Sequence, residues 1–280
     1  MTSPLGPAPT VAPRDGERLV RGEITGLERA AACRIEDFLL GGGHNFAVDR
    51  TVAHQLLQVH PDLRASAIQG GRAFLFRAVR LLAADKVSQF LVLGSSLPLV
   101  GSVHEMATRT TRGFRVVYVD AEPVALAFTH TAVSGVRGVG VIAEAPDQPV
   151  IALDTAVRAQ MLDIAHPVAV VMAGLAPVLP GGPIARQVCA DLRKRLSKGS
   201  CLVVAHAVAT KDRLRVAQAA EICQMAGIPL VLGSPATTEA MLSGFELMAP
   251  GLVSVNRWRP DDEDEQVAPL PFLGCVAVKP

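Results

Sequence analysis

The sequence predicts an α/β domain built on a parallel β-sheet with helices on both faces. Five short apolar runs recur along the chain, and each is separated from the next by a stretch long enough for a helix. Runs that are apolar throughout, rather than alternating, are typical of strands buried on both faces. Strands that alternate with helices in this way form parallel sheets. The strand candidates are Phe90–Leu93, Val116–Val119, Val139–Ile142, Val168–Met172 and Cys201–Ala205.

The composition predicts a soluble globular protein and disfavours proteins that bind nucleic acids or membranes. The chain has 280 residues, 50% of them hydrophobic and 19% charged, with a formal net charge of +1, which predicts one soluble domain with appendages. A single domain without appendages fits these numbers as well. The near-neutral charge argues against nucleic acid or an anionic membrane as the main partner, because both select a strong basic excess. Aromatic residues make up only 4% of the chain, which leaves few for a base-stacking surface.

The cysteines indicate free thiols rather than disulfides or metal ligands. There are five, far apart and without a Cys-x-x-Cys pair, so we expect a reducing compartment and no metal. The N-terminus lacks the basic start and apolar core of a signal peptide. The longest apolar stretch, Val168–Leu179, is shorter than the roughly 20 residues of a membrane-spanning helix. These features predict a cytoplasmic protein. The cysteines are Cys33, Cys189, Cys201, Cys223 and Cys275.

Three segments are expected along the chain. Residues 1–26 are rich in proline and lack apolar periodicity, which predicts a disordered or loosely attached leader. Residues 27–88 carry helical periodicity and are expected to form an N-terminal helical lid. Residues 89–280 contain the strand candidates and are expected to form the sheet domain.

The lid is predicted to contain a series of helices. The first starts at Leu27 and ends at the three glycines 41–43, and the others span Asp49–Val59 and Arg72–Asp85. On the first helix, Arg34 and Asp37 lie one turn apart. We therefore expect them to form a surface ion pair.

The C-terminal part is expected to close the edge of the sheet. One helix is predicted over Ile184–Leu196, and another begins with Ser234 as N-cap and Pro235 at its first position. The closely spaced strand candidates Gly251–Val255 and Leu273–Val278 follow. Strands this close in sequence suggest an antiparallel hairpin.

The loop after the first strand is the first candidate binding element. In an open parallel sheet, ligands bind outside the carboxyl ends of the strands, where the strand order reverses. Gly94 directly follows the first strand, and a helix is expected to begin near Ser102, so that its free N–H groups point at a ligand. A purely structural turn is an equally good interpretation, since this loop lacks a G-x-G-x-x-G pattern.

An acidic residue at the end of the second strand strengthens the ligand interpretation. Asp120 lies about 25 positions after Gly94, near the spacing expected of a carboxylate that accepts the hydroxyls of a ribose. The alternative is that Asp120 or Glu122 caps the helix that starts at Pro123.

A second acidic residue, Glu144, follows the third strand, where a carboxylate can accept from an exocyclic amino group. No Walker loop is present, which disfavours a phosphate-rich nucleotide. A ligand with a ribose and an adenine but few negative charges fits these features better.

Three segments carry a resemblance to a known family. They are Arg34-Ile-Glu-Asp-Phe-Leu-Leu-Gly-Gly-Gly-His-Asn-Phe-Ala-Val-Asp-Arg50, then Gly94…Leu97-Pro98…Gly101…Val103-His104-Glu105 with Val117-Tyr-Val-Asp120…Pro123, and finally Pro250-Gly-Leu-Val-Ser-Val-Asn-Arg-Trp-Arg-Pro-Asp261. From about Ala31 to Pro280, the chain resembles a family of bacterial S-adenosylmethionine-dependent methyltransferase-like proteins, long catalogued as a domain of unknown function.

The resemblance implies a class I methyltransferase (Rossmann-like) fold with a seven-stranded, mostly parallel sheet and an N-terminal helical lid. It implies S-adenosylmethionine as cofactor, with Asp120 on its ribose and Glu144 near its adenine. The methyl acceptor, a small molecule or a protein, is not predicted, and neither is the oligomeric state. The expected cofactor-binding residues are Asn45, Phe46, Gly94, Ser95, Ser96, Leu97, Pro98, His104, Asp120, Ala121 and Glu144.

Several positions depart from the family's pattern. The first loop usually reads Gly-Thr-Gly, and here Ser96 puts a side chain where the backbone is bare. Glu36 replaces a lid tyrosine, Gly43 replaces a lid lysine, and Pro177 stands in what is usually a Leu-His-Phe segment. These departures indicate a different ligand or the alternative function, a non-catalytic relative that acts through protein–protein contact. A nicotinamide-dependent oxidoreductase is a weaker third possibility.

Methyl transfer from a sulfonium needs little acid–base chemistry, so the sequence names no catalytic residue outright. His104 and His206 are the weak candidates, and each has a structural alternative, such as capping backbone groups or satisfying a strand end. Asn45 and Phe46 either close over the cofactor or, for Asn45, cap the helix that begins near Asp49.

Overall fold

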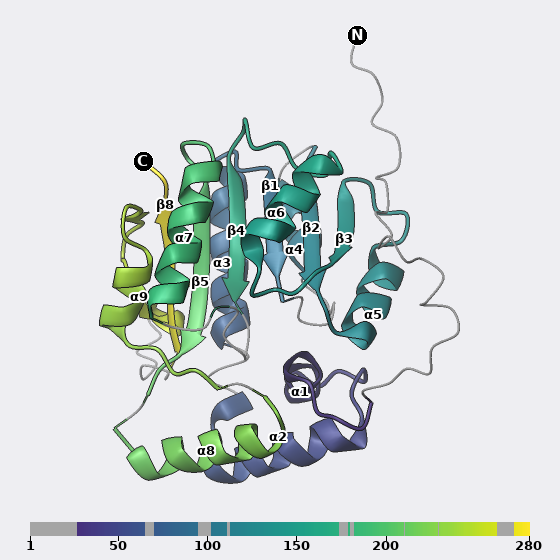
Figure 1. The fold of residues 1–280 in the computed structure, drawn as a ribbon, viewed down its shortest axis with the longest axis vertical. Coiled ribbons are helices and arrows are strands. Elements are labelled where there is room, and N and C mark those ends of the chain that lie inside the picture. The colour runs from purple at the N-terminus through teal and green to yellow at the C-terminus, as the bar shows by residue number, and fades with distance from the viewer. Residues whose placement is uncertain are drawn as a thin grey trace.

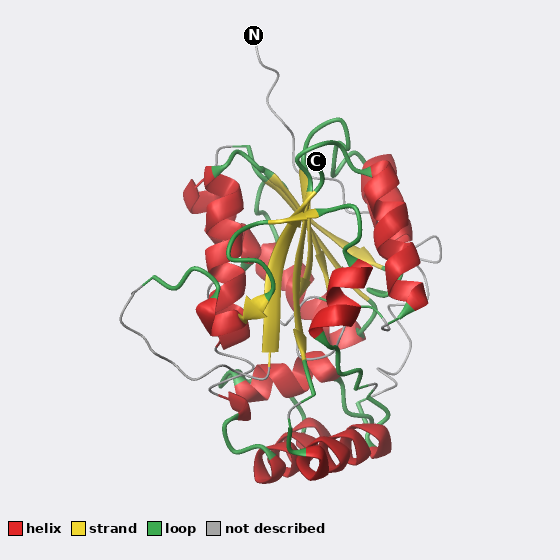
Figure 2. Cartoon of the chain, turned by 90° about the vertical axis from the view of Figure 1, so that its left-hand side faces the viewer, coloured by secondary structure: helices red, strands yellow, loops and turns green. Residues whose placement is uncertain are grey.

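A mixed sheet with helices on both faces forms the centre of the molecule (Figures 1 and 2). The structure, a computed structural model, describes residues 27–64, 70–94, 102–110, 113–173, 179, 182–209, 211–228, 230–261 and 272–280. The predicted leader over residues 1–26, the loop residues Ser95, Ser96, Leu97 and Pro98, and Pro177 lie outside these described residues. The predicted boundary between lid and sheet domain stays a prediction.

The five predicted parallel strands are confirmed, and the order of the sheet is β3-β2-β1-β4-β5-β8-β6. Strand β8 is antiparallel to β5, and two-residue strands β6 and β7 both pair with it. The pairing of β7 with β8 agrees with the predicted C-terminal hairpin. The strands are β1 (Gln89–Leu93), β2 (Arg115–Asp120), β3 (Val139–Ala143), β4 (Val168–Ala173), β5 (Cys201–Ala207), β6 (Glu246–Leu247), β7 (Val253–Ser254) and β8 (Phe272–Val278).

Alternate residues of each central strand point to opposite faces, which divides the core into two clusters. In β1, Phe90 and Val92 pack in the cluster with α3 and α4, whereas Leu91 and Leu93 pack in the cluster with α6 and α7. These strands are apolar throughout because both faces are covered, as the sequence predicts. The helices so far named are α3 (Gly70–Ala84), α4 (Val103–Thr110), α6 (Pro149–Arg158) and α7 (Pro183–Arg195).

Three of the remaining helices lie beyond the carboxyl edge of the sheet. Figure 1 shows α1, α2 and α8 below the ends of the parallel strands, while α5 follows β2 and α9 lies beside β5. Helix α9 begins as predicted, because the Ser234 hydroxyl accepts from the Thr237 amide at 3.2 Å and Pro235 follows. No helix in the described part of the chain is long and apolar enough to cross a membrane. These helices are α1 (Ala32–Leu39), α2 (Ala47–Val59), α5 (Pro123–Val133), α8 (Arg213–Met225) and α9 (Pro235–Met241).

The segment after β7 is fastened to α3 by a buried tryptophan. Trp258 is fully buried, and its ring meets Phe74 of α3 edge-on with centroids 5.2 Å apart. Arg77, also on α3, donates to the carbonyl oxygens of Trp258 at 2.9 Å and Val255 at 2.6 Å. This contact joins the C-terminal end of the fold to the last helix before β1.

Replacing this tryptophan should therefore lower stability strongly. We expect Trp258→Ala to reduce the free energy of unfolding by about 3–5 kcal/mol, because it removes a large ring from a packed core. Met225→Ala, at a side chain that is 84% exposed, should change it by no more than about 0.5 kcal/mol. Urea titrations followed by circular dichroism measure both values. Equal effects of the two changes would contradict this account of the anchor.

Candidate functional site

The order of the sheet places the candidate site at the carboxyl edge of β1, β2 and β4. Strands β1 to β3 extend the sheet in one direction and β4 and β5 in the other, so the order reverses between β1 and β4. Ligands of open α/β sheets bind at this reversal. Gly94, which follows β1, has a φ of +68° and donates its amide to the carbonyl of Val119 at 3.0 Å. The positive φ explains why glycine stands here.

Asp120 ends β2 at the same edge, with only 6% of its surface exposed. Its Oδ1 accepts from the amides of Ala121 at 2.8 Å and Glu122 at 2.9 Å. Glu122, not Asp120, is the N-cap of α5, because its Oε2 accepts from the Ala125 amide at 2.6 Å. The alternative of helix capping therefore holds for Glu122 and leaves Asp120 fixed at the end of its strand.

Glu144 lies beside Asp120. It follows β3, and its amide donates to the carbonyl of Asp120 at 3.1 Å. The strand register pairs Asp120 with Ala143, the last residue of β3. Two acidic side chains thus extend from neighbouring strand ends, as the sequence predicts for parallel strands.

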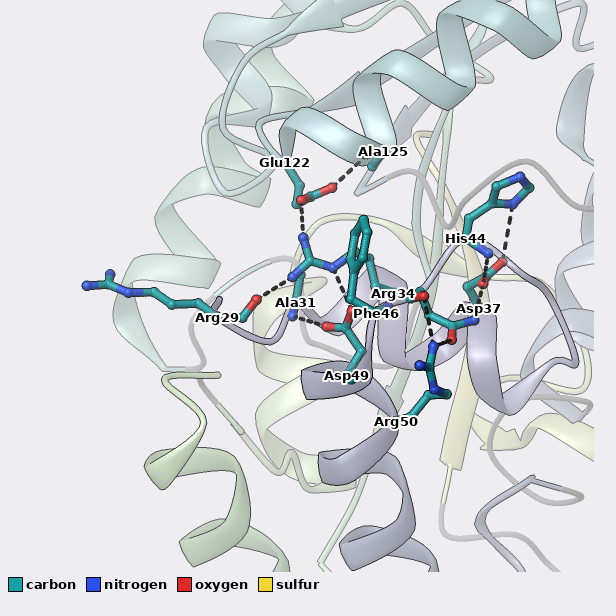
Figure 3. Close-up of polar contacts among 12 residues, drawn as sticks. Arg29, Ala31, Arg34, Asp37, His44, Phe46, Asp49, Arg50, Glu122 and Ala125 are labelled. Carbon is teal, nitrogen blue, oxygen red and sulfur yellow. Dashed lines mark hydrogen bonds and ion pairs between the residues drawn. The ribbon is translucent and has the colours of Figure 1, made fainter. Parts of the chain in front are cut away.

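The predicted surface ion pair between Arg34 and Asp37 is wrong. Both side chains are 1% exposed, and they bind different partners. Arg34 donates through Nε to Asp49 at 2.9 Å and through Nη1 to Glu122 at 2.6 Å, and it also bonds the carbonyl of Arg29 (Figure 3). A guanidinium buried this deeply is stable only when its charge and donors are matched, and here two carboxylates and one carbonyl match them.

Asp49 connects the start of α2 with the chain before α1. Its side chain is fully buried and accepts from the amide of Ala31 at 3.0 Å and the amide of Phe46 at 2.9 Å, besides Arg34. The guanidinium of Arg34 also lies over the Phe46 ring, 5.2 Å from its centroid. Through Arg34 and Glu122, α1 and α2 are tied to the turn that follows Asp120.

Asp37 instead organises the glycine turn between α1 and α2. Its Oδ2 accepts from the His44 amide at 2.7 Å and from Asn45 Nδ2 at 2.8 Å. Asn45 also donates to the Gly42 carbonyl at 2.9 Å, while its own carbonyl and Oδ1 accept from Arg50 at 3.0 Å. Asn45 therefore shapes this turn and does not cap α2, whose N-cap position is Phe46. Cofactor contact by Asn45 and Phe46 stays a prediction.

Cys33 lies near the predicted ribose site, a position that the sequence pattern did not reveal. Burial raises the pKa of its thiol well above the usual range, and the nearby charges of Asp120 and Glu122 raise it further. The side chain is therefore a neutral thiol at physiological pH and a poor nucleophile. All five cysteines are free. No group of three or more potential metal ligands occurs in the part of the chain that the structure describes.

His104, a weak catalytic candidate, lies in a buried polar cluster at the start of α4. Its Nδ1 is 2.9 Å from the Tyr118 hydroxyl and 3.0 Å from the Ser102 hydroxyl. Burial lowers the pKa of His104 and raises the pKa of Tyr118 to about 12. Both groups are consequently neutral at pH 7, and their mutual hydrogen bonds link α4 to β2. A cofactor contact of His104 stays a prediction.

His206, the other candidate, lines a cavity of about 60 Å³ between β4, β5, α7 and α9. Its Nε2 is 2.6 Å from the Thr238 hydroxyl, and its Nδ1 is 3.0 Å from the carbonyl of Ala207. Burial lowers its pKa. The sequence predicts His206 at the end of the fifth strand. No pattern in the sequence singles out its partner Thr238, which lies 32 residues further on.

Comparisons with known proteins agree with this architecture. A family model described as S-adenosyl methyltransferase matches residues 22–280. A protein of the DUF574 family from Streptomyces avermitilis MA-4680 is similar, with a TM-score of 0.83 and 26% identity over 92% of this chain and 100% of the other. A protein from Thermobifida fusca YX, provisionally designated a methyltransferase, has a TM-score of 0.80 and 29% identity over 91% of this chain and 97% of the other. Comparison with curated proteins gave no match.

The buried charge of Arg34 should be essential for stability. We expect Arg34→Ala to lower the free energy of unfolding by about 3–5 kcal/mol, because Asp49 is left buried without its cation. Arg80→Ala removes the exposed pair with Asp261, whose side chains are 63% and 60% exposed, and should cost no more than about 1 kcal/mol. Thermal and urea unfolding measure both. A loss below 1 kcal/mol for Arg34→Ala would show that Arg34 is not the link described here.

The glycine turn provides a second, matched prediction. A Cβ at Gly42 would lie 2.0 Å from Asp37 Oδ1, whereas a Cβ at Gly43 would meet nothing within 4 Å. We expect Gly42→Ala to lower the free energy of unfolding by about 1–3 kcal/mol, since Asp37 must move and give up its bonds. Gly43→Ala should leave stability unchanged or raise it slightly. Urea titration of the two variants side by side tests this, and equal losses would refute the assigned role of Asp37.

Proposed function

The chain belongs to the S-adenosyl methyltransferase family, and from this premise we propose that it transfers the methyl group of S-adenosylmethionine, the family's cofactor, to an acceptor. The proposed cofactor site is the carboxyl edge of β1, β2 and β3. The observation that carries this proposal is the fixed carboxylate of Asp120 at the end of β2. We propose the cytoplasm as the place of the reaction, which suits a chain with five free cysteines.

The residues at this edge fit the proposed cofactor. A carboxylate at the second strand end suits the two hydroxyls of a ribose, and Asp120 is held there by two backbone amides. Gly94 brings bare backbone to the end of β1 with a positive φ. Glu144, next to Asp120, suits the amino group of an adenine.

The protein's part in the reaction is mainly to bind and orient. Bound S-adenosylmethionine supplies a methyl group on a sulfonium that already is a good leaving group. Asp120 and Glu144 would hold the adenosine end at β2 and β3, which would leave the other end toward β1 and β4. Arg34 neutralises Glu122 and holds the N-terminal helices against this edge. Such positioning accounts for a large share of the rate enhancement in two-substrate reactions.

Calorimetry with S-adenosylmethionine tests the proposal. We expect micromolar binding to the wild-type protein. Asp120→Ala should weaken it by at least about tenfold, because each hydrogen bond to a charged group contributes about 1.5–3 kcal/mol. The control Asp154→Ala removes a 44% exposed carboxylate on α6 and should bind as wild type. No heat at millimolar cofactor would contradict the proposal and favour the alternative, a non-catalytic protein that acts through protein–protein contact.

Binding alone does not demonstrate catalysis. The decisive measurement is the transfer of a labelled methyl group to an acceptor, either a small molecule or a protein. Loss of transfer in Asp120→Ala but not in Asp154→Ala would connect the activity to the proposed site.

A further inference from the structure

We propose that the cavity between β5 and α9 binds the methyl acceptor, that this acceptor is a small uncharged molecule with a hydroxyl group, and that Thr238 and His206 together accept its proton. This inference rests on the proposed function, because it assigns the second substrate of the same reaction.

The cavity is correctly placed for an acceptor. It opens at the ends of β4 and β5, on the opposite side of β1 from Asp120 and β2. Adjacent strands lie about 4.8 Å apart, so the cavity lies one to two strands, or about 5–10 Å, from the end of β1. A cofactor anchored by its ribose at β2 would extend its sulfonium in this direction.

The lining of the cavity defines the chemistry of the acceptor. Most of the residues around it are apolar, including Met172, Leu179 and Met241, and none of the described lining residues is charged at neutral pH. An anionic or cationic ligand would lose its hydration there without a matching charge. The volume of about 60 Å³ is several times what one water molecule needs, and the cavity is open on one side, so that the hydroxyl end of a larger molecule can enter it.

At the polar end of the cavity, the Thr238 hydroxyl contacts two acceptors but has only one hydrogen to donate. Thr238 Oγ1 lies 2.6 Å from His206 Nε2 and 2.9 Å from the Ser234 carbonyl, but a hydroxyl has one hydrogen to donate. His206 Nδ1 faces the carbonyl of Ala207 at 3.0 Å, so a neutral ring carries its hydrogen on Nδ1 and presents a lone pair at Nε2. The hydrogen of Thr238 then points to Nε2, and its oxygen can accept from a ligand.

Only a protonated ring satisfies all three contacts at once. In that state Nδ1–H donates to Ala207, Nε2–H donates to Thr238, and the Thr238 hydroxyl donates to Ser234. Burial lowers the pKa of His206 and keeps the resting ring neutral, with the backbone bond to Ala207 opposing that shift. The hydrogen-bond geometry therefore favours a protonated His206, while the resting ring is neutral.

The proposed step balances in atoms and charge. The acceptor oxygen forms a bond to the methyl carbon while the bond from that carbon to sulfur breaks, and the electron pair of that bond stays on sulfur. The acceptor's hydroxyl proton passes to Thr238 Oγ1, and the Thr238 hydrogen passes to His206 Nε2. A sulfonium and a neutral imidazole become a neutral thioether and an imidazolium, which then releases its proton to water.

The position of His206 depends on a glycine in the adjacent segment. A Cβ at Gly233 would lie 2.4 Å from Cε1 of the His206 ring. The backbone before α9 thus lies so close to the ring that only glycine fits at position 233. This close approach fixes the ring between Ala207 and Thr238.

Phenol, benzene and benzoate are suitable probes for this cavity. Each is titrated into protein with labelled methionine methyl groups, with and without S-adenosylhomocysteine, and the signals of Met172 and Met241 are followed by NMR. We expect phenol to shift both signals and to bind about tenfold more tightly than benzene, because of one hydrogen bond to Thr238. Benzoate should not bind. Equal binding of phenol and benzene, tighter binding of benzoate, or unchanged methionine signals would overturn the inference.

Variants of Thr238 locate the hydrogen bond. Thr238→Val should remove the advantage of phenol over benzene, whereas Thr238→Ser, which keeps the hydroxyl, should retain it. In wild-type protein, NMR of the His206 ring should show a neutral ring with its hydrogen on Nδ1 at pH 7. A ring protonated at pH 7, or carrying its hydrogen on Nε2, would overturn the proton transfer independently of any variant.

The two proposals fail separately. A protein that binds phenol in the expected manner but ignores S-adenosylmethionine would contradict the proposed function. A protein that binds S-adenosylmethionine but shows none of the expected phenol selectivity would contradict the acceptor site alone.

Discussion

The ion pairs of Arg34 are the constraint on which the arrangement of the site depends. A guanidinium that is 1% exposed must find its partners within the fold, because an unpaired buried charge costs several kcal/mol. Its partners Asp49 and Glu122 lie 15 and 88 residues away in sequence. The two ion pairs therefore tie together three separate segments, which are α1, the start of α2 and the turn after β2. That arrangement places Cys33 near Asp120 and directs the N-terminal helices to the carboxyl edge.

The same constraint changes how the departures from the family's pattern are interpreted. The resemblance implies a lysine where Gly43 stands, and a Cβ there would meet nothing within 4 Å, whereas a Cβ at Gly42 would lie 2.0 Å from Asp37 Oδ1. The hydrogen bonds of Asp37 thus require a glycine at position 42 but not at position 43. The resemblance implies a tyrosine where Glu36 stands, and the charge of Glu36 opposes the lowering of the Arg72 pKa by burial.

Local patterns in the sequence predicted the strands, the cap of α9 and the acidic strand ends, because each depends on neighbouring residues or on the shared edge of a parallel sheet. The partners of Arg34 escaped prediction for the opposite reason. Helical spacing favours Asp37, one turn away, and gives no information on contacts across 88 residues. Helix α8 was not predicted, since its exposed Leu214 and Met225 obscure its apolar period. Thr238 escaped notice because its role appears only when β5 and α9 are side by side.

Charge divides the carboxyl edge into two chemically different halves. Acidic side chains follow β2 and β3, where Asp120 and Glu144 lie side by side, while the described lining of the cavity at β4 and β5 contains no charged side chain. On the proposed assignment, the hydroxyls and the amino group of the adenosine donate to the acidic half, and an uncharged acceptor avoids a desolvation cost in the uncharged half. A charged ligand would find no matching charge in the uncharged half, and the cost of its lost hydration discriminates against it there. The unfilled hydrogen-bond position between His206 and Thr238 lies in this uncharged half. There the neutral hydroxyl of the acceptor must lose its proton as the methyl group arrives.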